Sequence, residues 1–391
     1  MPRRRASVPG IFAPLALVLA CSASPGDAGG GTGSSATGTT STTAASEGSG
    51  PSDTTSMGST GGAPLPMPGP DVDIPAFSAE HVYFLPDDNR RQVDVEVEFP
   101  ESDLSYETVT LSVDLTCPNG DACDWWDRLG WIGIVENAGT DDERIVELAR
   151  FVTPYRIGAA WSFDLTMLRP LLAGPRTIRL FIDTWVGPGH ANGEGWVVDA
   201  TFAFRGGVPD PLPVWVLPVW HQTTFESGNP AAPYTDHVPP ADVALPEPAD
   251  VVLLQSLITG HGQGNAENCA EFCQKTHGFL VGDLPVQRVV WRDDCDQTPA
   301  QPQQGTWTYP RAGWCPGAEV RPWVEDVTAG VAADGTASIV YAMSDYENTC
   351  RPDAPVCMGC TLGTGCEYDG GNHTMPRYVL SAHLVGARTL P

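Results

Sequence analysis

The chain has 391 residues but a single lysine, Lys275, so arginine carries nearly all of its positive charge. The arginines are scattered and form no basic run after the N-terminus. The 48 acidic residues outweigh the 21 basic ones and give a formal net charge of −27. Nucleic-acid binding requires a basic surface that neutralises phosphates. We therefore expect no nucleic-acid partner.

Long hydrophobic runs are also missing. The one apolar run, Ile11 to Ala20, is too short to span a bilayer and follows three arginines. It ends in Val-Leu-Ala-Cys at residues 18–21, which resembles the lipobox of bacterial lipoproteins. This pattern predicts a signal peptide over residues 1–20 and lipidation of Cys21, and the alternative is an ordinary secretory signal. We expect a lipid-anchored protein of the bacterial cell envelope, with the outer membrane or cell surface favoured because Ser22 is not an aspartate.

Residues 21–70 are almost devoid of large apolar side chains and consist mainly of Gly, Ser, Thr, Ala and Pro. Such a segment buries too little apolar surface to offset its ordering entropy. We predict a disordered tether between the lipidated cysteine and the folded part, so that a membrane is a partner through the anchor only.

Helical periodicity is nearly absent from the rest of the chain; only Met167 to Leu172 suggests a short helix. Period-two alternation and β-branched or aromatic runs predict many short strands, and such a pattern favours β-sandwiches. A Gly-Gly-Val-Pro-Asp-Pro boundary divides two domains, over residues 71–207 and 208–391. Strands are expected at Val93–Phe99, Thr108–Leu115, Ile178–Trp185, Val198–Phe204, Val214–Trp220, Val251–Ile258, Ile339–Met343 and Tyr378–Val385.

Three segments carry candidate chemistry, and the first is Cys117-Pro-Asn-Gly-Asp-Ala-Cys123 with the Asp-Trp-Trp-Asp-Arg that follows. A small bridged turn would present Asp127 rigidly beside indole rings. A partly desolvated carboxylate is a candidate base or nucleophile, and indole faces suit sugars. The alternative is a surface pair of Asp127 with Arg128 and tryptophans that belong to the core.

The second segment is Cys269-Ala-Glu-Phe-Cys273, where a bridge over so short a spacing would fix the direction of Glu271. A metal site formed by these cysteines with His277 is the alternative, although an oxidising compartment favours the disulfide.

The third segment runs from Tyr309 to Gly317 and reads Y-P-R-A-G-W-C-P-G. Arg311 in this segment can donate paired hydrogen bonds to a carbonyl or carboxylate. The alternative is a structural ion pair with one of the many acids.

The order and the residue sequences of these segments resemble those of the peptide-N-glycosidase F family, whose members are bacterial amidases that remove N-linked glycans from asparagine. The likeness covers most of residues 75–391 and is strongest in 117–187 and 253–317. The phrases that carry it are C-P-N-G-D-A-C-D-W-W-D-R, R-F-V-T-P-Y (150–155), F-I-D-T-W (181–185), L-I-T-G-H-G (257–262), C-A-E-F-C and R-A-G-W-C-P-G. The resemblance implies two adjacent jelly-roll β-sandwiches with the active site in the cleft between them.

Carried over by motif, the resemblance implies that Asp127, Glu271 and Arg311 are catalytic. Asp127 would be the base or nucleophile, while Arg311 and Glu271 would position the carbonyl and first sugar. A substrate-contacting glutamate of the family falls on Asp183, and a tryptophan of its second domain falls on His261. The expected substrate-binding residues are Trp126, Asp183, Trp185, His261 and Trp314.

The implied reaction hydrolyses the amide between the innermost N-acetylglucosamine and asparagine of N-linked glycoproteins or glycopeptides, leaving aspartate. It needs no cofactor, and we expect no metal and a monomer. Because Asp183 and His261 depart from the family, a non-catalytic or differently specialised glycan-binding lipoprotein is the rival. A third interpretation, a copper monooxygenase of related double jelly-roll fold, is disfavoured because the eight histidines contain no H-x-H pair.

The chain has 11 cysteines, an odd number. Lipidation accounts for Cys21, and the resemblance implies the bridges Cys117–Cys123, Cys269–Cys273 and Cys295–Cys315. Four cysteines remain in an insertion, residues 345–377, that the resemblance does not explain. Their export favours two local disulfides over a zinc site; these cysteines are Cys350, Cys357, Cys360 and Cys366.

Overall fold

The computed structural model describes residues 66–351 and 374–390, which belong to one compact unit, residues 62–391. The signal peptide, Cys21, most of the tether and most of the insertion lie outside the described residues. The described chain is all-β with short 3-10 turns, as the alternation pattern predicts. Across that part of the chain, no helix is long and apolar enough to cross a membrane.

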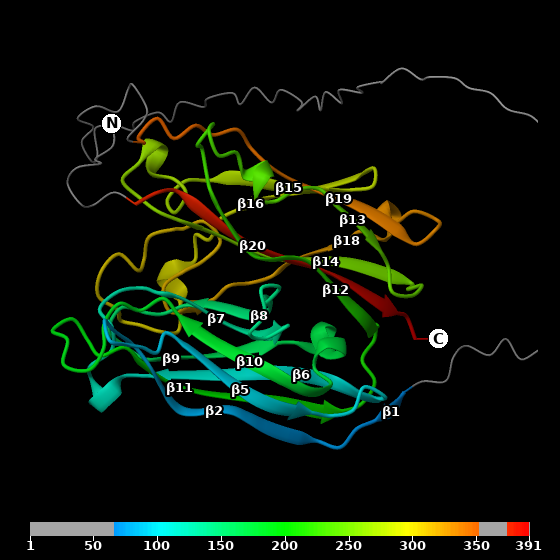
Figure 1. The fold of residues 1–391 in the computed structure, drawn as a ribbon, viewed down its shortest axis with the longest axis horizontal. Coiled ribbons are helices and arrows are strands. Elements are labelled where there is room, and N and C mark those ends of the chain that lie inside the picture. The colour runs from blue at the N-terminus through cyan, green and yellow to red at the C-terminus, as the bar shows by residue number, and fades with distance from the viewer. Residues whose placement is uncertain (1–65, 352–373, 391) are drawn as a thin grey trace, which may run out of the picture. The chain divides into compact units, whose positions relative to one another are not determined.

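The first sandwich consists of two five-stranded sheets (Figure 1). One sheet contains β1 (Met67–Pro68), β6 (Leu104–Thr116), β11 (Trp196–Gly206) and β2 (Val72–Val82) in that order, with β9 (Ala159–Asp164) paired to β6. The other contains β17 (Ala318–Glu319), β8 (Arg144–Val152), β7 (Leu129–Glu136), β10 (Gly174–Ile182) and β5 (Gln92–Phe99).

Two four-stranded sheets make the second sandwich, in the upper half of Figure 1. One has the order β12 (Leu212–Glu226), β20 (Arg377–Arg388), β14 (Val251–His261) and β18 (Trp323–Asp326). The other has the order β13 (Ala241–Ala244), β19 (Thr336–Met343), β15 (Lys275–Val281) and β16 (Leu284–Val290). The sheets of the two sandwiches therefore divide between Gly206 and Leu212, except that β17 crosses back to pair with β8.

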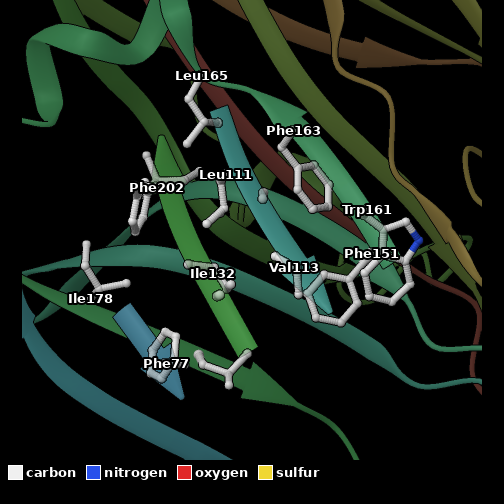
Figure 2. Packing of buried hydrophobic residues seen from close by; sticks show 14 of the residues in the cluster. Phe77, Leu111, Val113, Ile132, Phe151, Trp161, Phe163, Leu165, Ile178 and Phe202 are labelled. Atoms are coloured by element: carbon white, nitrogen blue, oxygen red, sulfur yellow. The ribbon is translucent and has the colours of Figure 1, made fainter. Parts of the chain in front are cut away.

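Alternating side chains build the core of the first sandwich. Leu111 and Val113 of β6 point inward with Phe202 of β11, and they pack on Ile132 and Ile178 of the facing sheet (Figure 2). All five are at most 1% exposed. The strand expected over Ile178–Trp185 is shifted toward the N-terminus: β10 begins at Gly174 and ends at Ile182, so Asp183 and Trp185 lie on the segment that follows. The expected short helix is a 3-10 turn, Thr166–Leu171.

Three strands are buried along most of their length rather than on one face: β8, β14 and β20. Their second face packs against the other sandwich, where Val152, Leu257, Trp314 and Val320 form an apolar cluster. This contact between sandwiches fixes the ends of β8 and β14, and both strands lead into the candidate site.

Candidate active site

Asp127 lies on the short segment between the Cys117–Cys123 bridge and β7. The bridge closes the loop around a 3-10 turn, Pro118–Gly120. Asp127 then approaches the second sandwich, and its Oδ2 lies 3.7 Å from Nη2 of Arg311. The side chain of Asp127 is 16% exposed, so it keeps limited access to solvent.

Asp124 anchors this segment and is completely buried. Its carboxylate accepts hydrogen bonds from the backbone N–H of Trp126 at 3.0 Å, from Nε of Arg128 at 2.7 Å and from the hydroxyl of Thr184 at 2.7 Å. Arg128 is therefore paired with Asp124 and not with Asp127, which answers the surface-pair alternative. Sequence reasoning missed Asp124, although its place in the D-W-W-D-R motif was the available signal.

Glu271 lies inside the Cys269–Cys273 bridge and is held by its own backbone. Its N–H donates to the carbonyl of Gly262 at 3.0 Å, and its carbonyl accepts from the N–H of Ala312 at 2.9 Å. Backbone hydrogen bonds thus connect the 269–273 loop to Gly262, just after β14, and to Ala312, just after Arg311. Because these bonds are local to Glu271, its carboxylate is directed at Arg311, whose Nε donates to Oε1 at 3.1 Å.

Arg311 is the centre of the site, with no exposed side-chain surface. A guanidinium has five N–H donors, and each has an acceptor here. Nε donates to Glu271, Nη1 donates to the carbonyls of Thr306 and Tyr309, and Nη2 donates to the hydroxyls of Thr306 and Tyr155. The contact with Tyr155 is the longest, at 3.4 Å. The Nη2 end that faces Asp127 and Tyr155 is therefore the least tightly held.

Burial raises the pKa values of both carboxyl groups. For Asp127, desolvation raises the pKa, while the charge of Arg311 and a hydrogen bond from Tyr155 oppose that increase. For Glu271, desolvation and the negative charge of Asp127 together raise the pKa to about 7, against the lowering effect of Arg311. Glu271 thus keeps its proton up to nearly neutral pH. Asp127, beside it, lies in a different environment.

Tyr155 is a further residue of the site that was not predicted individually. It is buried, and its hydroxyl contacts Nη2 of Arg311 at 3.4 Å and the hydroxyl of Thr306 at 3.3 Å, and it also forms a hydrogen bond with Asp127. Its pKa is raised by burial and by the charge of Asp127. The R-F-V-T-P-Y motif contained this residue, but the motif alone gave it no role.

The predicted substrate-binding residues divide into two groups, and the first group is exposed. Trp126 and Trp185 are 53% and 52% exposed. Asp183 pairs with Arg91 at 3.3 Å, and the guanidinium of Arg91 lies over the ring of Trp185 at 4.3 Å. The N–H of Asp183 donates to the carbonyl of Leu129, two residues after Asp127. The structure thus brings Asp183 beside the Asp127 segment.

The second group, His261 and Trp314, is buried, and their sugar contacts stay a prediction. Trp314 is 3% exposed and donates its indole N–H to the carbonyl of Gly260 at 2.7 Å. His261 stacks on Trp314 at 5.3 Å and contacts the hydroxyl of Thr259 at 2.9 Å. Packing between the sandwiches covers both rings. The ring of Trp314 also contacts Arg311, with its centroid 4.8 Å from the guanidinium carbon.

The structure contains the three disulfides implied by the resemblance, Cys117–Cys123, Cys269–Cys273 and Cys295–Cys315. Within the described residues, Glu267, Cys269 and Cys273 are the one group close enough to hold a metal ion. The disulfide removes the two thiolates that such a site needs, and His277 is buried against the hydroxyl of Tyr341. The metal alternative is therefore wrong. Cys350 is disulfide-bonded, while Cys357, Cys360 and Cys366 lie outside the described residues.

The fold and the site define a two-sandwich, all-β protein in which a buried arginine holds a carboxylate from each sandwich. The family profile "Peptide-N-glycosidase F, C terminal" matches residues 231–362. A peptide-N(4)-(N-acetyl-beta-D-glucosaminyl)asparagine amidase F from Elizabethkingia miricola is 28% identical over 264 residues, 64% of this chain and 71% of that protein. Residues 231–362 of the chain thus resemble the peptide-N-glycosidase F family, and most of the folded part is similar to an amidase of that family.

Solved structures agree with this fold. The structure of PNGase F, a glycosylasparaginase from Flavobacterium meningosepticum, matches with a TM-score of 0.65 at 22% identity, covering 83% of this chain and 97% of that one. The structure of PNGF-II matches with a TM-score of 0.59 at 18% identity, covering 82% of this chain and 66% of that one. The predicted pair of jelly-roll sandwiches is confirmed.

Proposed function

We propose that this chain hydrolyses the amide bond between the innermost N-acetylglucosamine and the asparagine of N-linked glycoproteins or glycopeptides. The products are the released glycan, as a glycosylamine, and a peptide in which aspartate replaces asparagine. Similarity to the peptide-N-glycosidase F family supports the reaction class. The observation that carries the proposal for this chain is the convergence of Asp127 and Glu271, one from each sandwich, on the buried Arg311.

Asp127 acts on the amide carbonyl, either by taking a proton from the attacking water or by attacking the carbonyl itself. Its ionised form is the active one in both routes. Tyr155 and Arg311 stabilise that form against the cost of burial. The cost of burial leaves the carboxylate weakly solvated, and a weakly solvated carboxylate is a stronger base than one in water.

Arg311 and Glu271 stabilise the charges that develop during the reaction. Four of the N–H groups of Arg311 are held at 3.1 Å or less, so their main task is to fix the two carboxylates and the 306–309 segment. The looser Nη2 group is the donor left for the developing negative charge on oxygen. Glu271, with a pKa of about 7, can exchange a proton near neutral pH, which suits a group that orients or protonates the leaving nitrogen.

The exposed rings of Trp126 and Trp185 supply apolar faces for the sugars next to the scissile bond. Asp183 supplies a hydrogen-bond acceptor for sugar hydroxyls, held in place by Arg91. Since Asp183 is one methylene shorter than a glutamate, it requires the sugar to approach more closely. Glycan preference is therefore the property in which this chain is expected to differ from its relatives.

The purified full chain, incubated with a denatured N-glycosylated protein, tests the proposal. We expect release of the glycan together with conversion of asparagine to aspartate, both measured by mass spectrometry. Asp127→Asn should reduce the rate by at least about a hundredfold, while Asp242→Asn, an exposed aspartate of β13, should leave it unchanged. Binding of the glycoprotein without release would instead support the glycan-binding alternative.

We also propose that Cys21 is lipidated and anchors a monomer in the bacterial cell envelope, at the outer membrane or cell surface. The support is the Val-Leu-Ala-Cys sequence after a short apolar run. Metabolic labelling with a fatty-acid analogue should mark the wild-type chain and not Cys21→Ser. Label retained in Cys21→Ser would refute the anchor.

A further inference from the structure

The second sandwich has a cavity of about 290 Å³ at its lateral edge. The strands β16 and β18 are the last strands of their respective sheets, and they are not paired with each other. The space between the two sheets therefore opens to solvent along this side. The cavity is lined by residues of both edge strands, by Ser256 and Ile258 of β14, and by the 291–294 and 313 segments.

Period-two alternation explains why polar groups enter this space. On β16, Leu284, Val286, Arg288 and Val290 lie on the same face of the strand. Leu284, Val286 and Val290 pack into the core of the second sandwich. Arg288 belongs to that inward face but reaches the open edge, where it lines the cavity. The floor is apolar, since Ile258, Val290 and Trp323 are all core residues.

Three groups that line the cavity have no hydrogen-bond or ion-pair partner among residues 66–351 and 374–390. They are the indole N–H of Trp291, the guanidinium of Arg288 and the carboxylate of Asp293. Trp291 is half-buried, so one part of its ring packs on the core while another faces the cavity. The cavity thus offers two donors, one acceptor and an aromatic surface to a ligand.

The remaining charges of the cavity are already neutralised. Arg292 donates to both oxygens of Asp294, at 2.8 and 3.1 Å. Arg321 pairs with Asp294 at 3.0 Å and with Glu319 at 3.1 Å. The unpaired groups, Arg288 and Asp293, carry opposite charges. A strongly anionic ligand would therefore meet no net positive charge, whereas a neutral ligand rich in hydroxyl groups finds both donors and acceptors.

We infer that this cavity is a second carbohydrate site that binds one neutral pyranose unit of a glycan chain. Its volume suits a ligand of one ring. A pyranose has an apolar face that packs on indole rings and a rim of hydroxyl groups that pairs with arginine and aspartate. None of Asp127, Glu271 and Arg311 lines this cavity, although it adjoins the proposed catalytic site: Arg292 pairs through its backbone with Arg311, and Gly313 lines the cavity.

The physical consequence is bivalent capture of a branched glycan or of a glycoprotein carrying several glycans. Two sites on one chain raise the effective concentration of the second sugar once the first is bound. The gain appears only for substrates long enough to reach both sites. Short glycopeptides should not benefit.

Binding of a free neutral high-mannose oligosaccharide to the full chain tests the inference without requiring hydrolysis. Asp127→Asn serves as the background, and affinity is measured by calorimetry and by NMR titration. We expect Trp291→Ala and, separately, Arg288→Ala to abolish one of two binding events or weaken it at least about tenfold. Val324→Ala, an exposed residue of β18, is the matched control and should leave both events intact.

Arg288→Ala removes an exposed side chain without a partner in the described chain, so it should fold as the wild type does even if Trp291→Ala does not. When Arg288→Ala is introduced into the wild-type chain, without Asp127→Asn, the rate of hydrolysis of a short glycopeptide should not change. A single binding event that Trp185→Ala removes and Arg288→Ala does not would overturn the inference. So would binding of a sialylated oligosaccharide with no binding of the neutral one. A lack of amidase activity would contradict the proposed function but leave this binding result intact.

Discussion

The site depends on Arg311, which is fully buried. Each of its five N–H groups donates a hydrogen bond. A buried arginine without partners would destabilise the fold. Here two carboxylates, two carbonyls and two hydroxyls surround it, and they come from both sandwiches. The same contacts that make its burial tolerable also hold the reactive groups at fixed distances.

Removal of the Tyr155 hydroxyl is predicted to shift the pH dependence of the reaction. In Tyr155→Phe, Asp127 loses a hydrogen bond that favours its ionised form, so its pKa rises further. The acidic limb of the activity profile should move to higher pH, with a loss of stability of only about 1 kcal/mol. Tyr309→Phe, which alters an exposed ring, is the control and should not move the limb. An unshifted limb in Tyr155→Phe would contradict the assignment.

Glu271 is predicted to make stability fall as pH rises toward neutrality. Its pKa is about 7 in the folded chain and near its ordinary value of 4.5 when unfolded, so the folded chain binds more protons between these values. The free energy of unfolding should therefore decrease from about pH 4.5 to pH 7. Glu271→Gln mimics the protonated form, and in it this part of the decrease should be absent. Parallel thermal unfolding of both chains over this range measures the difference.

At the scale of the element, two short bridged loops and the 306–311 segment present the three reactive side chains. Neither loop belongs to a long strand. Each is held by backbone hydrogen bonds to neighbouring segments, such as Trp125 to Asn192 and Glu271 to Gly262. A disulfide in so small a loop restricts the unfolded chain only slightly. Its larger effect is to direct the carboxylate beside it.

Replacement of Cys269 and Cys273 by serine is therefore predicted to harm activity more than stability. The loss of loop-closure entropy for so short a loop is about 2 kcal/mol. Glu271 gains freedom, so kcat should fall by about tenfold or more when measured well below the melting temperature. The double variant Cys295→Ser/Cys315→Ser, which opens a longer loop, should lose more stability. Full activity in the Cys269/Cys273 variant would show that the bridge contributes to stability only and does not direct Glu271.

Across the whole molecule, a buried ion pair joins the two sandwiches. Glu147 and Arg150 of β8 are both completely buried and pair at 2.6 Å. Arg150 also donates to the hydroxyl of Thr259 at 2.9 Å and to the carbonyl of Val379 at 2.8 Å, both in the second sandwich. Ser381 donates to Glu147. This network fixes the relation between the segments that carry Asp127 and Arg311.

Arg150→Met is predicted to destabilise the molecule by about 3–5 kcal/mol, because it leaves Glu147 buried and unpaired. Adding Glu147→Gln should recover part of that loss. Denaturant unfolding measures both changes. Arg205→Met is the control, since its pair with Asp73 is largely exposed, and it should change stability by about 1 kcal/mol or less. Equal losses in the two arginine variants would argue against the network.

The sequence by itself determined the local features of this protein. Alternation in Val93–Phe99, Thr108–Leu115 and Val198–Phe204 predicted β5, β6 and β11, because a strand with one buried face must alternate. The motif wording also singled out Asp127, Glu271 and Arg311, which lie together in the structure.

Only the tertiary structure decided what depends on the second sandwich. The burial of Trp314 and His261, the doubly covered strands β8, β14 and β20, and the crossing of β17 all arise where the sandwiches pack. Tyr155 acquires its role in the same way, through an arginine far along the chain. The period of a sequence pattern shows which face of a strand is apolar, but it does not show which distant segment covers the other face. That distant segment determines how deeply the side chains are buried, and burial in turn determines the pKa values of the carboxyl groups in the site.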